Sequence, residues 1–373
     1  MSEAETPHLP SFEIPREFSC EFPWERLALP LMAAEDALAR LDERLRASPI
    51  KQGWIARMHF IDACASSWLE GELVHLEDLV LHDAGMNARR PTPEIIHAYH
   101  VLSVRRIIAQ QSPERALESI DFALEERWSA AAVSEQADTR FLQDASNVAE
   151  SALDEALRAV DLALARTGRA LAEPDEAQEG AERHSRPEQS GDDIARSWRE
   201  GLQRHAHLPP LLAAGLVWDD CEAQLGESAT LRRDLWPGRL LAGAFLMRRG
   251  KARAHLPCIN LGLRAVPWER RRSTDATVRL LAWLDAALAG ADAGLKECDR
   301  LLLMRDVHLA KCAGRRATSR LPELIALALE SPYITTGMVT QRLGVSLRAA
   351  LNLIRELGLR EATGRGRFRA WML

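Results

Sequence analysis

Several features that identify secreted, membrane or zinc-binding proteins are missing from this chain of 373 residues. The six cysteines are widely separated and form no C-x-x-C pair, which argues against a disulfide framework and against a thiolate zinc site. The first residues are acidic and contain prolines, unlike a signal peptide. The longest apolar run, Leu208–Trp218, is too short to cross a bilayer. We therefore expect a cytoplasmic protein with reduced thiols and no membrane partner.

Sequence motifs of common enzymes are also missing. The chain has no H-E-x-x-H, no Walker loop, no G-x-G-x-x-G and no G-x-S-x-G. Its eleven histidines include His97 and His100, three apart, and His205 and His207, two apart, but none forms a cluster with metal-ligand spacing. These patterns predict no metal and no cofactor.

The composition favours helices. Aromatic residues make up only 5% of the chain, apolar residues 47% and charged residues 27%, which is typical of a globular protein with a large core. Only four of the 48 basic residues are lysines, so a high local arginine count is weaker evidence here than elsewhere. Apolar residues recur at helical spacing in the segments 31–46, 51–69, 76–81, 94–110, 113–132, 138–164, 194–204, 210–225, 237–249, 274–289, 295–311 and 321–330.

A polar segment with proline and glycine, residues 168–193, interrupts this helical pattern and predicts a disordered linker or a long exposed loop. An irregular, proline-rich arm is expected over 1–23, and 255–263 fits either a helix or a strand. The fold class we predict is mainly α, with a multi-helix body and a C-terminal winged helix-turn-helix. Four regions follow: a helical region 1–167, the linker 168–193, a second helical region 194–320, and the terminal module 321–373.

The last residues, 331–373, carry the clearest functional signal. A short apolar-periodic helix is predicted to end at Gly344, and Ser346 is a suitable N-cap for a second helix that ends at Gly358. One face of that helix carries the apolar residues Ala350, Leu353, Ile354 and Leu357. Two further short segments, 359–362 and 367–371, predict a hairpin. This order looks like a winged helix-turn-helix, which places its second helix in the DNA major groove.

Charge supports an interaction with DNA. Residues 331–373 contain seven arginines and two glutamates, a net +5, so the rest of a chain with net charge −6 carries −11. The major-groove residues that we predict are Ser346, Leu347, Arg348, Asn352 and Arg355. The predicted phosphate contacts are Thr335, Thr336 and Gln341, and those of the wing are Arg365, Arg367 and Arg369. The alternative is an ordinary helical hairpin with a solvated arginine face.

Two segments of the body resemble the Fic-type adenylyltransferases. Ser66-Ser67-Trp68-Leu69-Glu70-Gly71 is similar to the inhibitory helix of that family, in which the Glu pairs with an Arg of the catalytic loop. Gly238-Arg239 is similar to the end of that loop. However, Ser228 stands where the family has its general-base His, and Asp234 stands at the Asn position. The resemblance implies a degenerate Fic-like body without transferase activity, in which Glu70 and Arg239 form a buried ion pair.

The layout as a whole is similar to a family of uncharacterised proteins, many of them plasmid-borne in plant-symbiotic bacteria, which join a helical domain to a C-terminal helix-turn-helix. The resemblance is strongest in W-P-G-R-L-L-A-G-A-F-L and in the terminal R-L-G-V-S-L-R-A-A-L-N-L-I-R-E-L-G-L. We therefore predict a transcriptional regulator that binds double-stranded DNA, as a homodimer because one module buries little surface. The alternatives are an inactive Fic-like protein and an antitoxin-like module whose body binds a protein partner.

Overall fold

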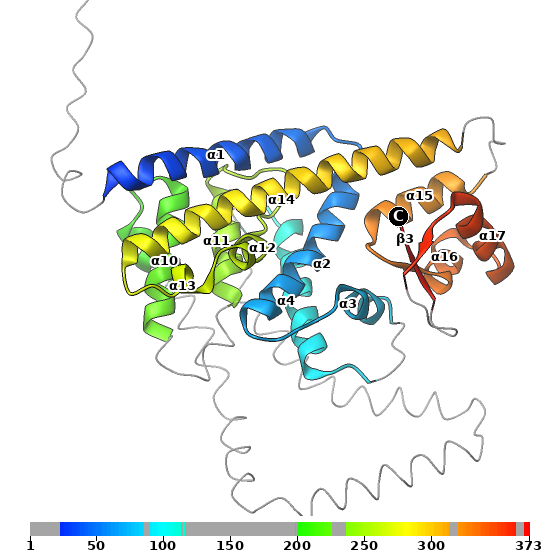
Figure 1. Cartoon of the computed structure of the whole chain (residues 1–373), viewed down its shortest axis with the longest axis horizontal. Helices are drawn as coiled ribbons and strands as arrows, with labels where there is room; N and C mark the ends of the chain where they lie inside the picture. The colour runs from blue at the N-terminus through cyan, green and yellow to red at the C-terminus, as the bar shows by residue number, and fades with distance from the viewer. Residues whose placement is uncertain are drawn as a thin grey trace, which may run out of the picture.

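The computed structural model describes residues 23–85, 90–112, 115, 198, 200–225, 236–312, 319–362 and 369–373. The expected arm 1–23 lies almost wholly outside these residues, as do the helices expected at 113–132 and 138–164 and the linker 168–193. The helices of the body are α1 (Trp24–Arg46), α2 (Lys51–Leu69), α3 (Leu76–Asp83), α4 (Pro93–Gln110), α10 (Pro210–Leu225), α11 (Trp236–Arg248), α12 (Ile259–Ala265), α13 (Trp268–Arg271) and α14 (Ala276–Ala310). Figure 1 shows them beside a smaller C-terminal module.

Helix α1 begins seven residues before the expected start at Leu31 and continues through Pro30. A proline inside a helix removes one backbone hydrogen bond. Leu27 and Leu31, which lie on either side of it, are both buried in the core. Their burial offsets the missing hydrogen bond, which sequence spacing alone does not reveal.

Helix α14 lies along α1, and the two helices run in the same direction (Figure 1). Arg44 near the end of α1 pairs with Asp299 of α14. The prediction of two helices, 274–289 and 295–311, was wrong, because α14 is one helix of 35 residues. Gly290 and Gly294, which lie between the two expected segments, are points of close packing: a Cβ on Gly290 would lie 2.7 Å from the Cys258 carbonyl oxygen, and one on Gly294 would lie 2.7 Å from the Leu41 side chain.

The segment 255–263, whose sequence fits either a helix or a strand, is helical from Ile259 onward, where helix α12 begins. It packs across α14 so closely that a Cβ on Gly262 would lie 1.9 Å from the Ala286 carbonyl oxygen. Gly262 and Gly290 therefore form a matched pair of small residues that lets two helix backbones meet. No side chain larger than hydrogen fits at Gly262 unless one backbone moves.

The C-terminal module contains three helices and a small sheet. Its helices are α15 (Leu321–Glu330), α16 (Thr336–Leu343) and α17 (Leu347–Leu357), and its strands are β1 (Ile334–Thr335), β2 (Arg360–Glu361) and β3 (Ala370–Met372). The sheet is antiparallel with strand order β1-β3-β2, and Glu361 pairs with Trp371. The pairing of β2 with β3 confirms the expected hairpin in its described part. Strand β1 was not predicted, because two residues are too short for a period-2 pattern. The fold is mainly α, as expected.

Helix α15 joins the module to the body. It packs on α2, where a Cβ on Gly53 would lie 2.9 Å from the Leu329 carbonyl oxygen. The guanidinium of Arg57, only 5% exposed, donates to the carbonyl oxygens of Leu329 (2.7 Å), Ala328 (2.5 Å) and Ser331 (2.8 Å). These carbonyls belong to the last turn of α15, where a helix lacks its own donors and attracts positive charge. One continuous apolar core includes residues of the body and of the module.

Candidate nucleic-acid interface and a polar network in the body

The turn between α16 and α17 is capped as the sequence predicts. The Ser346 hydroxyl accepts a hydrogen bond from the Ala349 amide (3.3 Å), which caps the start of α17. Gly344 and Gly358 end the two helices with φ of 64° and 74°, in the left-handed region that glycine adopts most easily. The Ser346 cap and the two glycines therefore define two short helices joined by a tight turn.

Helix α17 is strongly amphipathic. Ala350, Ile354 and Leu357 are buried against the rest of the module. The side chains predicted to read DNA bases lie on the opposite, exposed face: Ser346, Leu347, Arg348, Asn352 and Arg355. Arg355 donates to the amide oxygen of Asn352 at 3.2 Å. This face therefore carries guanidinium and amide groups about one helical turn apart.

The predicted phosphate contacts divide into two groups. Gln341 is exposed and Thr336 is partly buried, so both have polar atoms near the surface. Thr335 is less accessible than these two residues. It is 7% exposed, and its hydroxyl accepts a hydrogen bond from the Met338 amide (3.1 Å) as the N-cap of α16. Thr335 therefore stabilises the start of α16.

The predicted wing residues are only partly described. Arg365 and Arg367 lie outside the described residues. Arg369 is exposed, forms a two-point ion pair with Glu361 and lies 5.2 Å from the centre of the Trp371 ring. The Arg369 guanidinium lowers the pKa of the Glu361 carboxyl. The charge of Arg369 is therefore already compensated within the module, whereas Arg348 forms no ion pair with any other residue that the structure describes.

In the body, the predicted ion pair between Glu70 and Arg239 is present. Their nearest atoms are 2.5 Å apart, and both side chains are almost fully buried. Arg239 also donates to Asn260 Oδ1 (2.6 Å) and to Ser66 Oγ (3.1 Å), while the other Glu70 oxygen lies 2.7 Å from His97 Nε2. The pair joins the end of α2 to α11.

Both glycines that we singled out lie beside this pair. Gly71 follows α2 with a φ of 89°, a left-handed conformation that suits a glycine after a helix end. Gly238 allows close packing, since a Cβ there would lie 2.8 Å from the Trp218 ring.

The polar network continues through residues that sequence reasoning missed. Asp62 is fully buried and accepts hydrogen bonds from Arg105 (2.5 Å), from the Asn260 side chain (2.8 Å) and from the Leu261 amide (2.8 Å). Since Asn260 also binds Arg239, the chain of contacts crosses α4, α2, α12 and α11. The signal in the sequence was a charged residue inside an apolar helical face, as in Val104-Arg105. Such residues are buried only when a partner from another helix meets them.

The described residues show little other reactive chemistry. Cys64, Cys258 and Cys298 are free and buried, and burial raises the pKa of each thiol to about 12, so none is a ready nucleophile. No three His, Cys, Asp or Glu side chains in the described ranges gather as metal ligands would. In the same part of the chain, no helix is both long and apolar enough to span a membrane.

Comparison with known proteins identifies the class to which this protein belongs. Residues 321–373 match a family model described as "HTH DNA binding domain", and residues 188–313 match one described as "Protein of unknown function (DUF1612)". The protein is therefore a mainly helical protein that ends in a helix-turn-helix DNA-binding domain. It is 40% identical over 376 residues to "Uncharacterized protein y4cF" of Sinorhizobium fredii, a match that covers 92% of this chain and 96% of the relative. The chain belongs to the family of that protein.

Proposed function

We propose that the protein is a transcriptional regulator whose helix α17 enters the major groove of double-stranded DNA. The observation that carries this proposal is the division of α17 into a buried apolar face and an exposed face with Arg348, Asn352 and Arg355. Arginine pairs with the edge of guanine and asparagine with the edge of adenine. The hairpin of β2 and β3 serves as the wing in this proposal, which makes the module a winged helix-turn-helix.

The regulator acts as a homodimer in this proposal. A single recognition helix contacts a few base pairs, and isolated modules of this kind bury too little surface for high specificity. Two copies on a two-fold operator place their recognition helices about one DNA turn apart, roughly 34–36 Å. Sedimentation of the free protein and of its DNA complex measures the number of copies.

The test begins with selection of bound duplexes from random DNA by the full chain, followed by affinity measurements on the selected site. Arg348→Ala is expected to weaken binding by about 5-fold to 150-fold, because a good base contact is worth about 1–3 kcal/mol. Arg305→Ala, which changes a partly exposed arginine on α14 of the body, is the matched control and should leave binding unchanged. Selection of no sequence, or equal affinity of Arg348→Ala and the control, contradicts the proposal.

Point substitutions are better suited to this test than deletion of residues 331–373. From the sequence alone, we expect that deletion to leave a folded body. The structure argues against this expectation, because the module shares an apolar core with the body and Arg57 donates to the Ser331 carbonyl oxygen. Deletion would expose the buried face of α15 and remove one acceptor of a buried guanidinium. Loss of DNA binding in the truncated chain would then have two explanations.

We also propose that the body has no nucleotidyltransferase activity. The support comes from the sequence, in which Ser228 replaces the general base of the Fic-type pattern. The Glu70–Arg239 ion pair then has a structural role, since it joins α2 to α11. Glu70→Gly, incubated with labelled ATP, is expected to transfer no label to itself or to lysate proteins. Label transfer by this variant would overturn the proposal.

A further inference from the structure

Helix α17 has one large apolar side chain that stays on the surface. Leu347, the first residue of the helix, is 58% exposed. The other leucines of α17 and its isoleucine belong to the apolar core or pack against it: Leu351, Leu353, Ile354 and Leu357. A leucine stabilises a fold through the apolar surface that it removes from water, so Leu347 contributes little to the stability of the module.

Leu347 lies at the end of α17 that matters most for recognition. In helix-turn-helix proteins, the first residues of the second helix contact the edges of the bases. Leu347 directly follows Ser346, whose hydroxyl accepts a hydrogen bond from the Ala349 amide (3.3 Å) and is therefore occupied as the cap. Side chains on a helix tilt toward its N-terminus, so the exposed leucine extends past the first turn of α17.

The chemistry of Leu347 differs from that of its exposed neighbours. Arg348, Asn352 and Arg355 carry hydrogen-bond donors, which suit the edges of guanine and adenine. The side chain of Leu347 has neither a donor nor an acceptor, so it cannot read a base through hydrogen bonds. The apolar feature among the base edges of the major groove is the C5 methyl group of thymine, which apolar side chains contact. An exposed leucine at this place therefore fits thymine better than any other base.

We propose that Leu347 contacts the methyl group of one thymine in each half-site and makes the protein prefer thymine at that position. This inference rests on the proposed entry of α17 into the major groove, and it names a base that the first residue of the helix reads. The contact removes the methyl group and the leucine side chain from water together. Burial of one methyl group changes an affinity by about fourfold, which is enough for a preference at one base pair.

Deoxyuridine is the probe, because it lacks the C5 methyl group of thymidine and keeps the same hydrogen-bonding edge. The full chain first selects bound duplexes from random DNA, and deoxyuridine then replaces each thymine of the selected site in turn. One such replacement in each half-site should weaken binding of the wild type by about fourfold. In Leu347→Ala, the same replacement should change the affinity by less than about twofold, because the shorter side chain no longer reaches the methyl group.

Three variants serve as controls. Leu29→Ala changes a leucine that is 75% exposed near the start of α1, at the opposite end of the protein from α17 (Figure 1), and should keep the full effect of deoxyuridine. Leu347→Met preserves an apolar side chain of similar size and should keep most of the effect. Arg348→Ala should weaken binding to both duplexes and also keep the effect, since Arg348 contacts a different base.

The outcomes separate this inference from the proposed function. A selected site in which no thymine is sensitive to deoxyuridine overturns the inference and leaves DNA binding by α17 in place. An effect of deoxyuridine that persists unchanged in Leu347→Ala also overturns it, because another side chain then contacts the methyl group. Selection of no sequence by the wild type overturns the proposed function and, with it, the assignment of Leu347.

Discussion

The contact between Arg57 and the end of α15 makes a sharp prediction about how the DNA-binding module is held. We consider Arg57→Met, which keeps much of the apolar stem but removes the guanidinium. In the structure this group donates to three carbonyl oxygens in the last turn of α15. Burial lowers the pKa of Arg57 to about 10, with a further contribution from the positive charge of Arg300. Arg57 therefore stays charged at neutral pH.

The size of the expected loss in stability follows from the carbonyl oxygens that Arg57→Met leaves without a donor. Each buried acceptor that loses its donor costs about 1–3 kcal/mol. The buried charge of Arg57 already destabilises the wild type, so removal of the charge recovers part of that free energy. We therefore expect a loss of about 3–5 kcal/mol in the free energy of unfolding, less than the sum for three strong hydrogen bonds. This is a large share of the 5–15 kcal/mol typical of a folded protein.

Urea unfolding followed by far-UV circular dichroism measures this loss. The control is Arg40→Met, which breaks an exposed pair with Asp36 and should cost less than about 1 kcal/mol. Limited proteolysis should also cut the C-terminal module of Arg57→Met faster than that of wild type. Equal stability of Arg57→Met and Arg40→Met would refute the assignment of Arg57 as the residue that fastens the module.

Two further predictions concern the interior of the body. Burial, together with the nearby charges of Arg105 and Arg106, holds the pKa of His59 well below its ordinary value, so the unfolded chain binds a proton there that the folded chain does not. Stability should therefore fall as the pH drops below about 6.5, the ordinary pKa of a histidine. Urea unfolding at about pH 7 and about pH 5 should show a smaller fall in His59→Leu than in wild type, and an unchanged fall contradicts the assignment. Gly262→Ala should lower the free energy of unfolding by about 3 kcal/mol or more, because the new methyl group meets the Ala286 carbonyl oxygen. Thermal unfolding close to that of wild type would contradict this prediction and show that α12 and α14 separate easily.

Much of the helical framework was predictable from the sequence. The ranges of α2, α10 and α15 agree with the periodic segments, and the caps at Ser346, Gly344 and Gly358 are in the expected places. These features depend on residues within a few positions of one another, such as a hydroxyl and the amide three residues later. The exposed face of α17 follows from the same periodicity, so most of the candidate DNA interface was visible before the fold was known.

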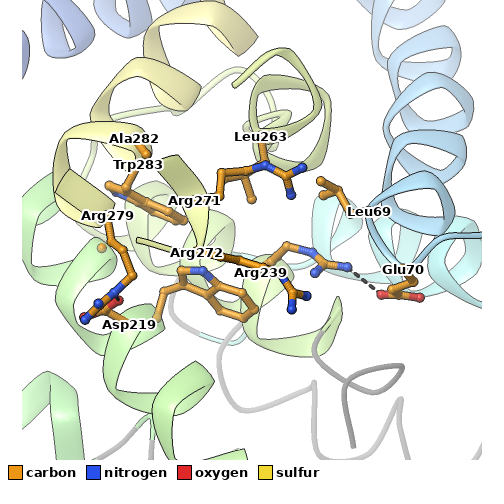
Figure 2. Close-up of a pocket in the computed structure, with 12 residues that line it drawn as sticks. Leu69, Glu70, Asp219, Arg239, Leu263, Arg271, Arg272, Arg279, Ala282 and Trp283 are labelled. Carbon is orange, nitrogen blue, oxygen red and sulfur yellow. Dashed lines mark hydrogen bonds and ion pairs between the residues drawn. The ribbon is translucent and has the colours of Figure 1, made fainter. Parts of the chain in front are cut away.

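The body was harder to predict, because its main contacts join distant residues. Asp62 and Arg105 are 43 positions apart, and Glu70 and Arg239 are 169 apart. The latter pair was expected only because of a resemblance to another family. Nothing in the sequence shows that Arg279 of α14 pairs with Asp219 of α10 (Figure 2). That pairing depends on which helices the fold brings together.

The sequence by itself determined the mainly helical class, the helix-turn-helix and the charge contrast between the module and the rest of the chain, since each is set by composition or by spacing along one segment. Only the tertiary structure decided the roles of individual residues. It made Gly290 and Gly294 packing positions inside one long helix, made Thr335 a buried N-cap of α16, and placed Arg57 against the end of α15. In each case, the physical reason is that a distant part of the chain supplies the neighbour.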